Sequence, residues 1–120
     1  MVKIAVVGSR SFRDVKRMEE ILNELLPTLD APVIVTGGAM GADTLAEQYA
    51  HARGIPCLVF KADWDKYGRA AGYIRNIKMA EEADRAVAFW DGKSRGTAHM
   101  IRIMRERKKP VEVVLFTEGG

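Results

Sequence analysis

Strand-like and helix-like segments alternate along this chain from end to end, and this alternation limits the possible folds more than any other feature of the sequence. Short, continuous runs of mostly apolar residues occur five times, at Lys3–Val7, Pro32–Thr36, Pro56–Phe60, Ala86–Trp90 and Val111–Phe116. Such runs are typical of strands that are buried on both faces of a parallel sheet. Between them lie four segments with apolar residues at three- and four-residue steps, which is the period of a helix.

Five strands with four intervening helices predict an α/β fold. We expect a doubly wound, Rossmann-like parallel sheet of about five strands in the order 3-2-1-4-5, within a three-layer sandwich. Right-handed crossovers would place helices on both faces of the sheet. The 120 residues contain no repeat and no linker, so we expect a single domain over residues 1–120. Ser11, three residues before Asp14, resembles a capping box and predicts that the first helix begins directly after Ser11.

Composition narrows the class of protein. The chain has 19 Lys and Arg against 16 Asp and Glu, a net charge of +3, which favours anionic ligands without indicating nucleic acid by itself. Cys57 is the only cysteine, which excludes an intrachain disulfide, and we expect it to be a small buried group in a strand. No apolar run approaches the roughly 20 residues of a membrane helix. Strand-like sequence from Val2 leaves no room for a signal peptide, so we expect a cytoplasmic location.

Three glycine-containing segments each follow a strand and precede a helix. They hold Gly8, then Gly37, Gly38 and Gly41, then Gly92 and Gly96. The carboxyl ends of parallel strands meet at one edge of the sheet, where helix N-termini offer free N–H groups, so we expect a phosphate or carboxylate site there. Neither Gly-x-x-x-x-Gly-Lys-Ser/Thr nor Gly-x-Gly-x-x-Gly occurs, so ATP hydrolysis and ordinary dinucleotide binding lack their usual signatures.

Aromatic side chains are expected near the same edge. Trp64, Tyr67, Tyr73 and Trp90 lie in or beside the loops that follow the strands, close in sequence to Arg69 and Arg75. Trp or Tyr beside an arginine can stack on a nucleobase. The alternative interpretation is that these rings pack on the core.

Several motifs together resemble the YspA-like branch of the SLOG superfamily. They are Val6-Val7-Gly8-Ser9-Arg10, Thr36-Gly37-Gly38-Ala39-Met40-Gly41-Ala42-Asp43, Ala62-Asp63-Trp64, Tyr67-Gly68-Arg69-Ala70-Ala71-Gly72 and Gly92-Lys93-Ser94-Arg95-Gly96-Thr97. The resemblance covers nearly the whole chain and implies a Rossmann-like domain that binds a nucleotide or a nucleotide-derived ligand. Many members of this superfamily have no assigned reaction, so the resemblance implies the fold more strongly than the function.

The resemblance extends to phosphoribohydrolases, which release a base from a nucleoside 5′-monophosphate. Residues 75–79 are similar to their Arg-Lys-x-x-Met stretch, with Asn76 in place of Lys. Residues 91–100 are similar to their Pro-Gly-Gly-x-Gly-Thr-x-x-Glu stretch, without the Pro-Gly-Gly. The catalytic Glu of that family falls at Met100, whose thioether cannot stabilise an oxocarbenium-like centre or activate water. The arginine is present at Arg75 and the carboxylate is absent, which argues against hydrolysis.

Motifs and resemblance together predict one ligand site at the carboxyl edge of the sheet. The residues expected to form it are Gly8, Ser9, Arg10, Gly37, Gly38, Ala39, Gly41, Asp43, Trp64, Arg69, Arg75, Asn76, Gly92, Lys93, Ser94, Arg95, Gly96 and Thr97. Loop carboxylates Asp63, Asp65 and Asp91 leave open a Mg²⁺ ion that bridges a ligand phosphate. His99, near the start of the last helix, is interpreted either as a structural residue or as a phosphate contact.

Three functions stay open. A binding or sensing domain for a nucleotide is favoured. The second is an enzyme that cleaves an N-glycosidic or phosphate bond, with Asp43, Glu47, Asp91 and Arg75 as candidate catalytic residues. The third is a single-stranded nucleic-acid binder, because DNA-processing protein A shares the superfamily. We also expect a homodimer, because superfamily relatives are commonly oligomeric and the last helix carries an apolar strip, Met100, Ile103 and Met104.

Overall fold

The computed structural model describes residues 1–117 and contains a five-stranded parallel sheet in the order β3-β2-β1-β4-β5. The strands are β1 (Val2–Gly8), β2 (Pro32–Thr36), β3 (Cys57–Val59), β4 (Arg85–Trp90) and β5 (Val111–Leu115). Strand order and parallel pairing are those predicted. β1 lies at the centre of the sheet, with β2 and β3 on one side and β4 and β5 on the other.

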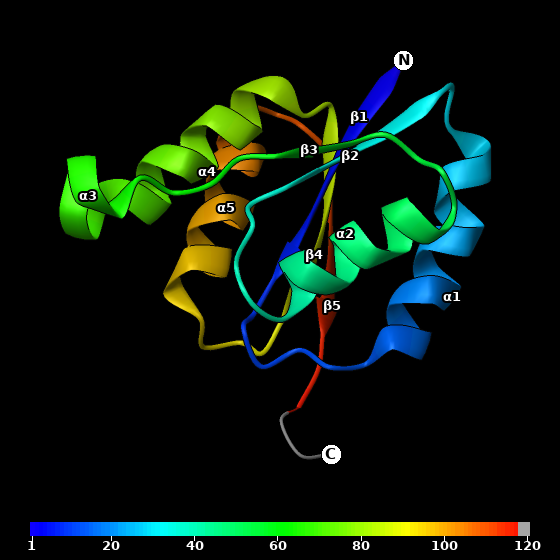
Figure 1. Cartoon of the computed structure of the whole chain (residues 1–120), viewed down its shortest axis with the longest axis horizontal. Coiled ribbons are helices and arrows are strands. Elements are labelled where there is room, and N and C mark those ends of the chain that lie inside the picture. Colours follow the sequence, from blue (N-terminus) through cyan, green and yellow to red (C-terminus); the bar gives the residue numbers. More distant parts are fainter. Residues whose placement is uncertain (118–120) are drawn as a thin grey trace.

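Helices cover both faces of this sheet (Figure 1). α1 (Val15–Leu25) and α2 (Ala42–Ala52) pack on one face, whereas α4 (Ala71–Glu82) and α5 (Arg95–Glu106) pack on the other. A short helix, α3 (Trp64–Tyr67), and a 3₁₀ turn, Gly68–Ala70, precede α4, and a second 3₁₀ turn, Leu26–Thr28, follows α1. The predicted three-layer sandwich is therefore confirmed, with α3 as an additional short helix. No helix within residues 1–117 has the length and apolarity needed to cross a bilayer.

Two buried cores result from the alternation of side chains along the strands. Ile4 and Val6 of β1 face the core under α1 and α2, while Ala5 and Val7 face the core under α4 and α5. The second core also holds Met100, Ile103 and Met104, and each of them is at least nine-tenths buried. The prediction of an exposed apolar strip on the last helix is therefore wrong, because these side chains cover the sheet. The homodimer itself stays a prediction without that support.

The edge strands depart from the sequence prediction. Leu58 and Val59 of β3 are 40% and 37% exposed, and Cys57 is only partly buried, so the expectations of a fully buried strand and a buried cysteine are wrong. An edge strand has a neighbour on one side only, and the helices cover it less completely than they cover β1 or β4. Burial nonetheless raises the pKa of the Cys57 thiol, and the charge of Glu47 acts in the same direction.

The first helix begins later than predicted. Asp14, not Ser11, is the N-cap, and its carboxylate accepts the N–H of Arg17 at 3.0 Å. The chain makes a turn first, in which the N–H of Phe12 donates to the carbonyl of Ser9 and the Phe12 ring enters the core. This turn keeps residues 9–11 out of the helix and at the sheet edge, where the loops gather.

Candidate functional site

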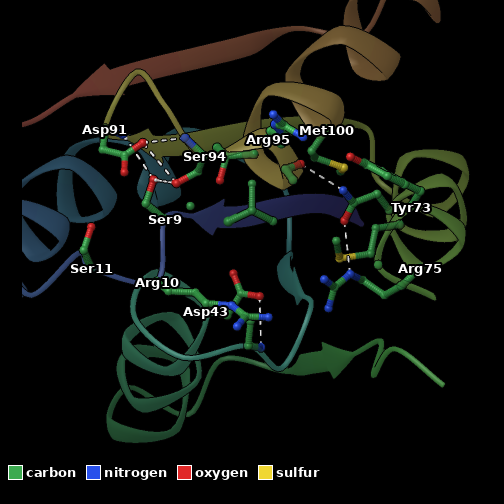
Figure 2. Close-up of a pocket in the computed structure, with 18 of the residues that line it drawn as sticks. Ser9, Arg10, Ser11, Asp43, Tyr73, Arg75, Asp91, Ser94, Arg95 and Met100 are labelled. Carbon is green, nitrogen blue, oxygen red and sulfur yellow. Dashed lines mark hydrogen bonds between the residues drawn. The ribbon is translucent and has the colours of Figure 1, made fainter. Parts of the chain in front are cut away.

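A cavity of about 500 Å³ opens at the carboxyl edge of the sheet, where β1 and β4 lie side by side. The strand order changes direction at this point. From β1 the chain continues to β2 and β3 on one side of the sheet, and it then returns to form β4 and β5 on the other side of β1. Ligands of open α/β sheets commonly bind at such a switch point. The cavity is walled by Gly8 at the end of β1 and residues 9–11 after it, Ala39 and Asp43 near the start of α2, Asp91 and residues 94–97 after β4, and one side of α4 (Figure 2).

Most of the predicted site residues line this cavity. The structure brings together Gly8, Ser9, Arg10, Ala39, Asp43, Trp64, Arg69, Arg75, Asn76, Ser94, Arg95, Gly96 and Thr97. Gly37, Gly38, Gly41, Gly92 and Lys93 do not line it. Of the four candidate catalytic residues, Asp43, Arg75 and Asp91 line the cavity, whereas Glu47 lies on α2 outside it, near Cys57.

Two glycines that do not line the cavity still affect its shape, because a side chain at either position would collide with residues that do line it. Gly41 has a φ of +78°, and a Cβ there would overlap the carbonyl oxygens of Ser9 and Arg10. A Cβ on Gly37 would lie 2.6 Å from Nη1 of Arg75 and 2.8 Å from Oδ2 of Asp43. The missing side chains therefore let α2 approach the loop after β1, and let Arg75 and Asp43 converge on the end of β2.

Ser9, Asp91 and Ser94 form a hydrogen-bonded cluster on one wall, visible in Figure 2. Oδ1 of Asp91 accepts the N–H groups of Lys93 and Ser94, both at 2.8 Å, and lies 3.0 Å from the Ser94 hydroxyl. The Ser94 hydroxyl also lies 2.8 Å from Oγ of Ser9, which accepts the N–H of Asp91 at 3.1 Å. These hydrogen bonds, that of the Ser94 N–H above all, hold the pKa of Asp91 well below its usual range. Asp91 is thus an anion that ties the loop after β4 to the loop after β1.

This cluster fixes the start of α5 against the cavity. The N–H groups of Arg95, Gly96 and Thr97 have no hydrogen-bond partner within residues 1–117, and no side chain caps this helix end. Free N–H groups and the positive end of the helix dipole attract anions. Four arginines line the cavity against two aspartates, which adds positive charge beyond that of the helix; they are Arg10, Arg69, Arg75 and Arg95.

Arg75 is held from two sides. Nη1 donates to the carbonyl of Gly37, and Nε donates to Oδ1 of Asn76 at 3.1 Å. Burial lowers the pKa of the Arg75 guanidinium, and the charge of Asp43 opposes this shift. No partner within residues 1–117 engages Nη2 of Arg75, so that nitrogen is available to a ligand. The guanidinium is thus positioned by the protein and retains free donors.

Asn76 connects α4 to α5. Its Nδ2 donates to the carbonyl of Gly96 at 3.0 Å and lies 3.2 Å from Nδ1 of His99. The His99 ring also packs edge-on against Tyr73, at 4.5 Å between ring centroids. Burial lowers the pKa of His99, and the positive charge of Arg102 acts in the same direction. His99 does not line the cavity, which agrees with its structural interpretation.

Asp43 is the second carboxylate of the cavity, and its surroundings differ from those of Asp91. The residue is 4% exposed; Oδ2 accepts the N–H of Ala39 at 3.1 Å, and Oδ1 is buried without a hydrogen-bond partner. Burial raises the pKa of Asp43 to about 6, although the Ala39 N–H and the charge of Arg75 lower it. A group that titrates near neutral pH therefore faces the cavity.

Two of the four aromatic residues reach the site. Trp64 and Tyr73 line the cavity and are 52% and 43% exposed, so their rings are available for stacking. Trp90 packs on the second core and donates its indole N–H to the carbonyl of Ser94 at 3.0 Å, which supports the loop from outside. Tyr67 lies beside Lys66 and Lys78, away from the cavity lining.

Some lining residues were absent from the predicted set. They are Val7, Ser11, Gly72, Tyr73, Met79, Asp91 and Met100, of which Tyr73 was expected near this edge as a stacking ring and Asp91 as a metal or catalytic carboxylate. Gly72, Tyr73 and Met79 share one side of α4 with Arg75 and Asn76, at the spacing of a helix face. Extending the helical period from Arg75 in both directions could have identified these three residues. No three His, Cys, Asp or Glu side chains within residues 1–117 lie close enough together to hold a metal ion, so Asp63, Asp65 and Asp91 do not converge on one.

Comparisons with known proteins agree with this architecture. Residues 2–67 match the family described as the YspA, cpYpsA-related SLOG family. The Gene 61 protein of Mycobacterium phage D29 is 34% identical over 118 residues, covering 92% of this chain and 94% of the phage protein. The crystal structure of DNA processing protein A from Streptococcus pneumoniae superposes with a TM-score of 0.78 at 21% identity. That superposition covers 98% of this chain and 51% of the Streptococcus chain, so it supports the fold and spans about half of that protein.

Proposed function

The chain belongs to the YspA, cpYpsA-related SLOG family, and from that premise we propose that it acts as a single domain that binds a nucleotide or a nucleotide-derived ligand at the carboxyl edge of its sheet. The observation that carries this proposal is the gathering of free N–H groups, hydroxyls and arginines around one 500 Å³ cavity that also has two exposed aromatic rings in its lining. A cavity of that volume lies within the usual range for small-molecule sites.

The arrangement suggests an orientation for the ligand. The phosphate would lie at the N-terminus of α5, near the Ser94 hydroxyl, with Arg10 and Arg95 as counter-charges. The base would stack on Trp64 or Tyr73 at the mouth, where Arg69 adds a cation. Arg75 lines the same cavity with Nη2 free of any partner within residues 1–117 and would donate to the sugar or the phosphate.

Calorimetric titration with the nucleoside 5′-monophosphates tests the proposal. We expect saturable binding of one nucleotide per chain and a roughly 10- to 100-fold loss of affinity in Arg75→Ala, because a hydrogen bond to a charged group contributes about 1.5–3 kcal/mol. Arg107→Ala is the matched control, since Arg107 is exposed near the C-terminus of α5 and pairs with Glu81 outside the cavity. Equal affinities for Arg75→Ala and Arg107→Ala would contradict the assignment of this cavity.

A nucleic-acid strand is the second candidate ligand, because arginines continue along α5 beyond the cavity. Arg95, Arg102 and Arg105 lie on one side of the helix, and two shallow depressions of about 420 and 450 Å³ adjoin them. DNA processing protein A has the same fold. If a strand binds, oligonucleotide affinity should fall steeply with salt, and Arg102→Ala should weaken oligonucleotide binding without affecting a mononucleotide.

Hydrolysis of a nucleoside monophosphate is the third candidate. Met100 lines the cavity and is buried, so no carboxylate occupies the position that the phosphoribohydrolases use, whereas Asp43 supplies a carboxylate elsewhere in the same cavity. Chromatographic detection of free base separates this candidate from simple binding. Turnover that Asp43→Asn abolishes would identify an enzyme, and binding without base release would favour a binding domain.

A further inference from the structure

We propose that Asp43 binds the 2′-hydroxyl group of the ligand's ribose, so that the cavity takes ribonucleotides in preference to 2′-deoxyribonucleotides. The inference rests on the proposed nucleotide binding and names the class of nucleotide. Its starting point is the unpartnered carboxylate oxygen of Asp43 inside the cavity (Figure 2).

An unpartnered buried oxygen is rare in this protein. Within residues 1–117, only Oδ1 of Asp43 and Nε of Arg85 are buried side-chain polar atoms without a hydrogen-bond partner, and Arg85 does not line the cavity. Burying a polar atom without a partner costs free energy, so such atoms are usually satisfied by a ligand, an ion or a water molecule. Oδ1 of Asp43 therefore marks a position at which a ligand donor would be stabilised.

The neighbours of Asp43 restrict the identity of that donor. Arg75 converges with Asp43 on Gly37, yet the two side chains form no ion pair within the described residues. An ionised carboxylate only accepts hydrogen bonds, and a guanidinium only donates them. A hydroxyl does both, so it can donate to Asp43 while it accepts from Arg75. A phosphate oxygen carries no proton to donate and would be repelled by the carboxylate.

The position of Asp43 in the cavity distinguishes a sugar hydroxyl from a base amine. The N–H of Ala42, the residue before Asp43, donates to the carbonyl of Ser9 at 3.3 Å, so Asp43 adjoins the loop of the proposed phosphate site. Trp64 and Tyr73 are exposed at the mouth, whereas Asp43 is deeply buried. In a nucleotide the sugar directly follows the phosphate and the base lies farther away. The group that reaches Asp43 is accordingly on the sugar.

Calorimetric titration at pH 7.5 with the four ribonucleoside 5′-monophosphates and their 2′-deoxy counterparts tests the inference. For the base that binds best, we expect roughly 10- to 100-fold tighter binding of the ribonucleotide, the range that follows from a charged hydrogen bond. Asp43→Asn should reduce that ratio to within a few-fold of one, chiefly by weakening the ribonucleotide. Glu47→Gln removes the same charge from the same helix outside the cavity and should leave the ratio unchanged.

The possible outcomes separate this inference from the proposed function. Equal affinities for the ribo and deoxy forms would overturn the inference while leaving nucleotide binding intact. A ribonucleotide preference that persists in Asp43→Asn would overturn the role of Asp43. Absence of binding for all of the monophosphates would overturn the nucleotide proposal, and this inference with it. The ratio in the unmodified protein does not depend on how well any variant folds.

Discussion

Replacing Asp43 by asparagine should stabilise the unliganded protein at neutral pH. The side chain is 4% exposed, and burial raises its pKa from 3.8 to about 6, despite the opposing effects of the Ala39 N–H and of Arg75. A shift of about two pKa units corresponds to about 3 kcal/mol, at 1.36 kcal/mol per unit. This is the order of magnitude by which the ionised carboxylate destabilises the native state at pH 7.

The sign of the pH dependence follows from the two protonation equilibria. Unfolded chains release the Asp43 proton near pH 3.8, whereas the native protein keeps it up to about pH 6. Between these values the native state binds more protons, so this group lowers the free energy of unfolding as pH rises, and its effect levels off above pH 6. The asparagine side chain of the variant does not titrate. The variant should therefore match the unmodified protein near pH 4 and exceed it by about 1–3 kcal/mol at pH 7.

Urea unfolding at pH 4, 5, 6 and 7 without nucleotide measures this difference by linear extrapolation. Taking the difference between the two proteins cancels the titration of groups that they share. Glu47→Gln serves as the control, because Glu47 is not fully buried and lies outside the cavity. A variant that is less stable than the parent at pH 7, or a difference that does not change between pH 4 and 7, would show that burial is not the dominant influence on Asp43.

Two further predictions concern the framework of the cavity. Gly41→Ala should destabilise the protein by at least about 2 kcal/mol in urea unfolding, and Gly92→Ala by about 1 kcal/mol. Both glycines have a positive φ, but only a Cβ at Gly41 would meet neighbouring backbone. Equal losses of stability in the two variants would argue against close packing of α2 on the loop after β1. Asp91→Asn should lower the free energy of unfolding by about 1–2 kcal/mol at pH 7. Because the pKa of Asp91 is depressed, this loss should shrink as the pH falls below 4, and a loss that is constant with pH would exclude the charge as its cause.

The strand order could be predicted because it follows from patterns that are recognisable within short stretches of sequence. Apolar runs separated by helical periods permit few topologies once crossovers are right-handed, and the observed order β3-β2-β1-β4-β5 is the predicted one. Burial at the edges could not be predicted in the same way. The runs that became β3 and β4 look alike in composition, yet Val59 is 37% exposed and Val87 is fully buried. Only the position of a strand within the sheet makes that difference.

The parts of the site that are formed by loops could be predicted from the sequence, whereas the part formed by α4 was harder to predict. Ser9 and Ser94 are 85 positions apart in the sequence, yet parallel pairing of β1 with β4 brings their hydroxyl oxygens to 2.8 Å. This is expected, because loops that follow parallel strands gather at one edge of the sheet. Tyr73 was expected near this edge as a possible stacking ring, with core packing as the alternative, but it was not placed in the site, because the loops alone do not indicate that one side of α4 faces the cavity. Lys93 is the opposite case, because it was predicted to belong to the site but does not line the cavity.

Asp43 and Asp91 show what residue type and spacing cannot determine about a site. Asp91 directly follows β4 and Asp43 lies seven residues after the end of β2, and both line the cavity. Asp91 accepts three hydrogen bonds through Oδ1 and has a depressed pKa, so its charge is already used in holding two loops together. Asp43 accepts one hydrogen bond through Oδ2, is more deeply buried, and has a raised pKa. Burial dominates at Asp43 and hydrogen bonding dominates at Asp91, and this difference in surroundings decides which carboxylate supports the structure and which one remains available to a ligand.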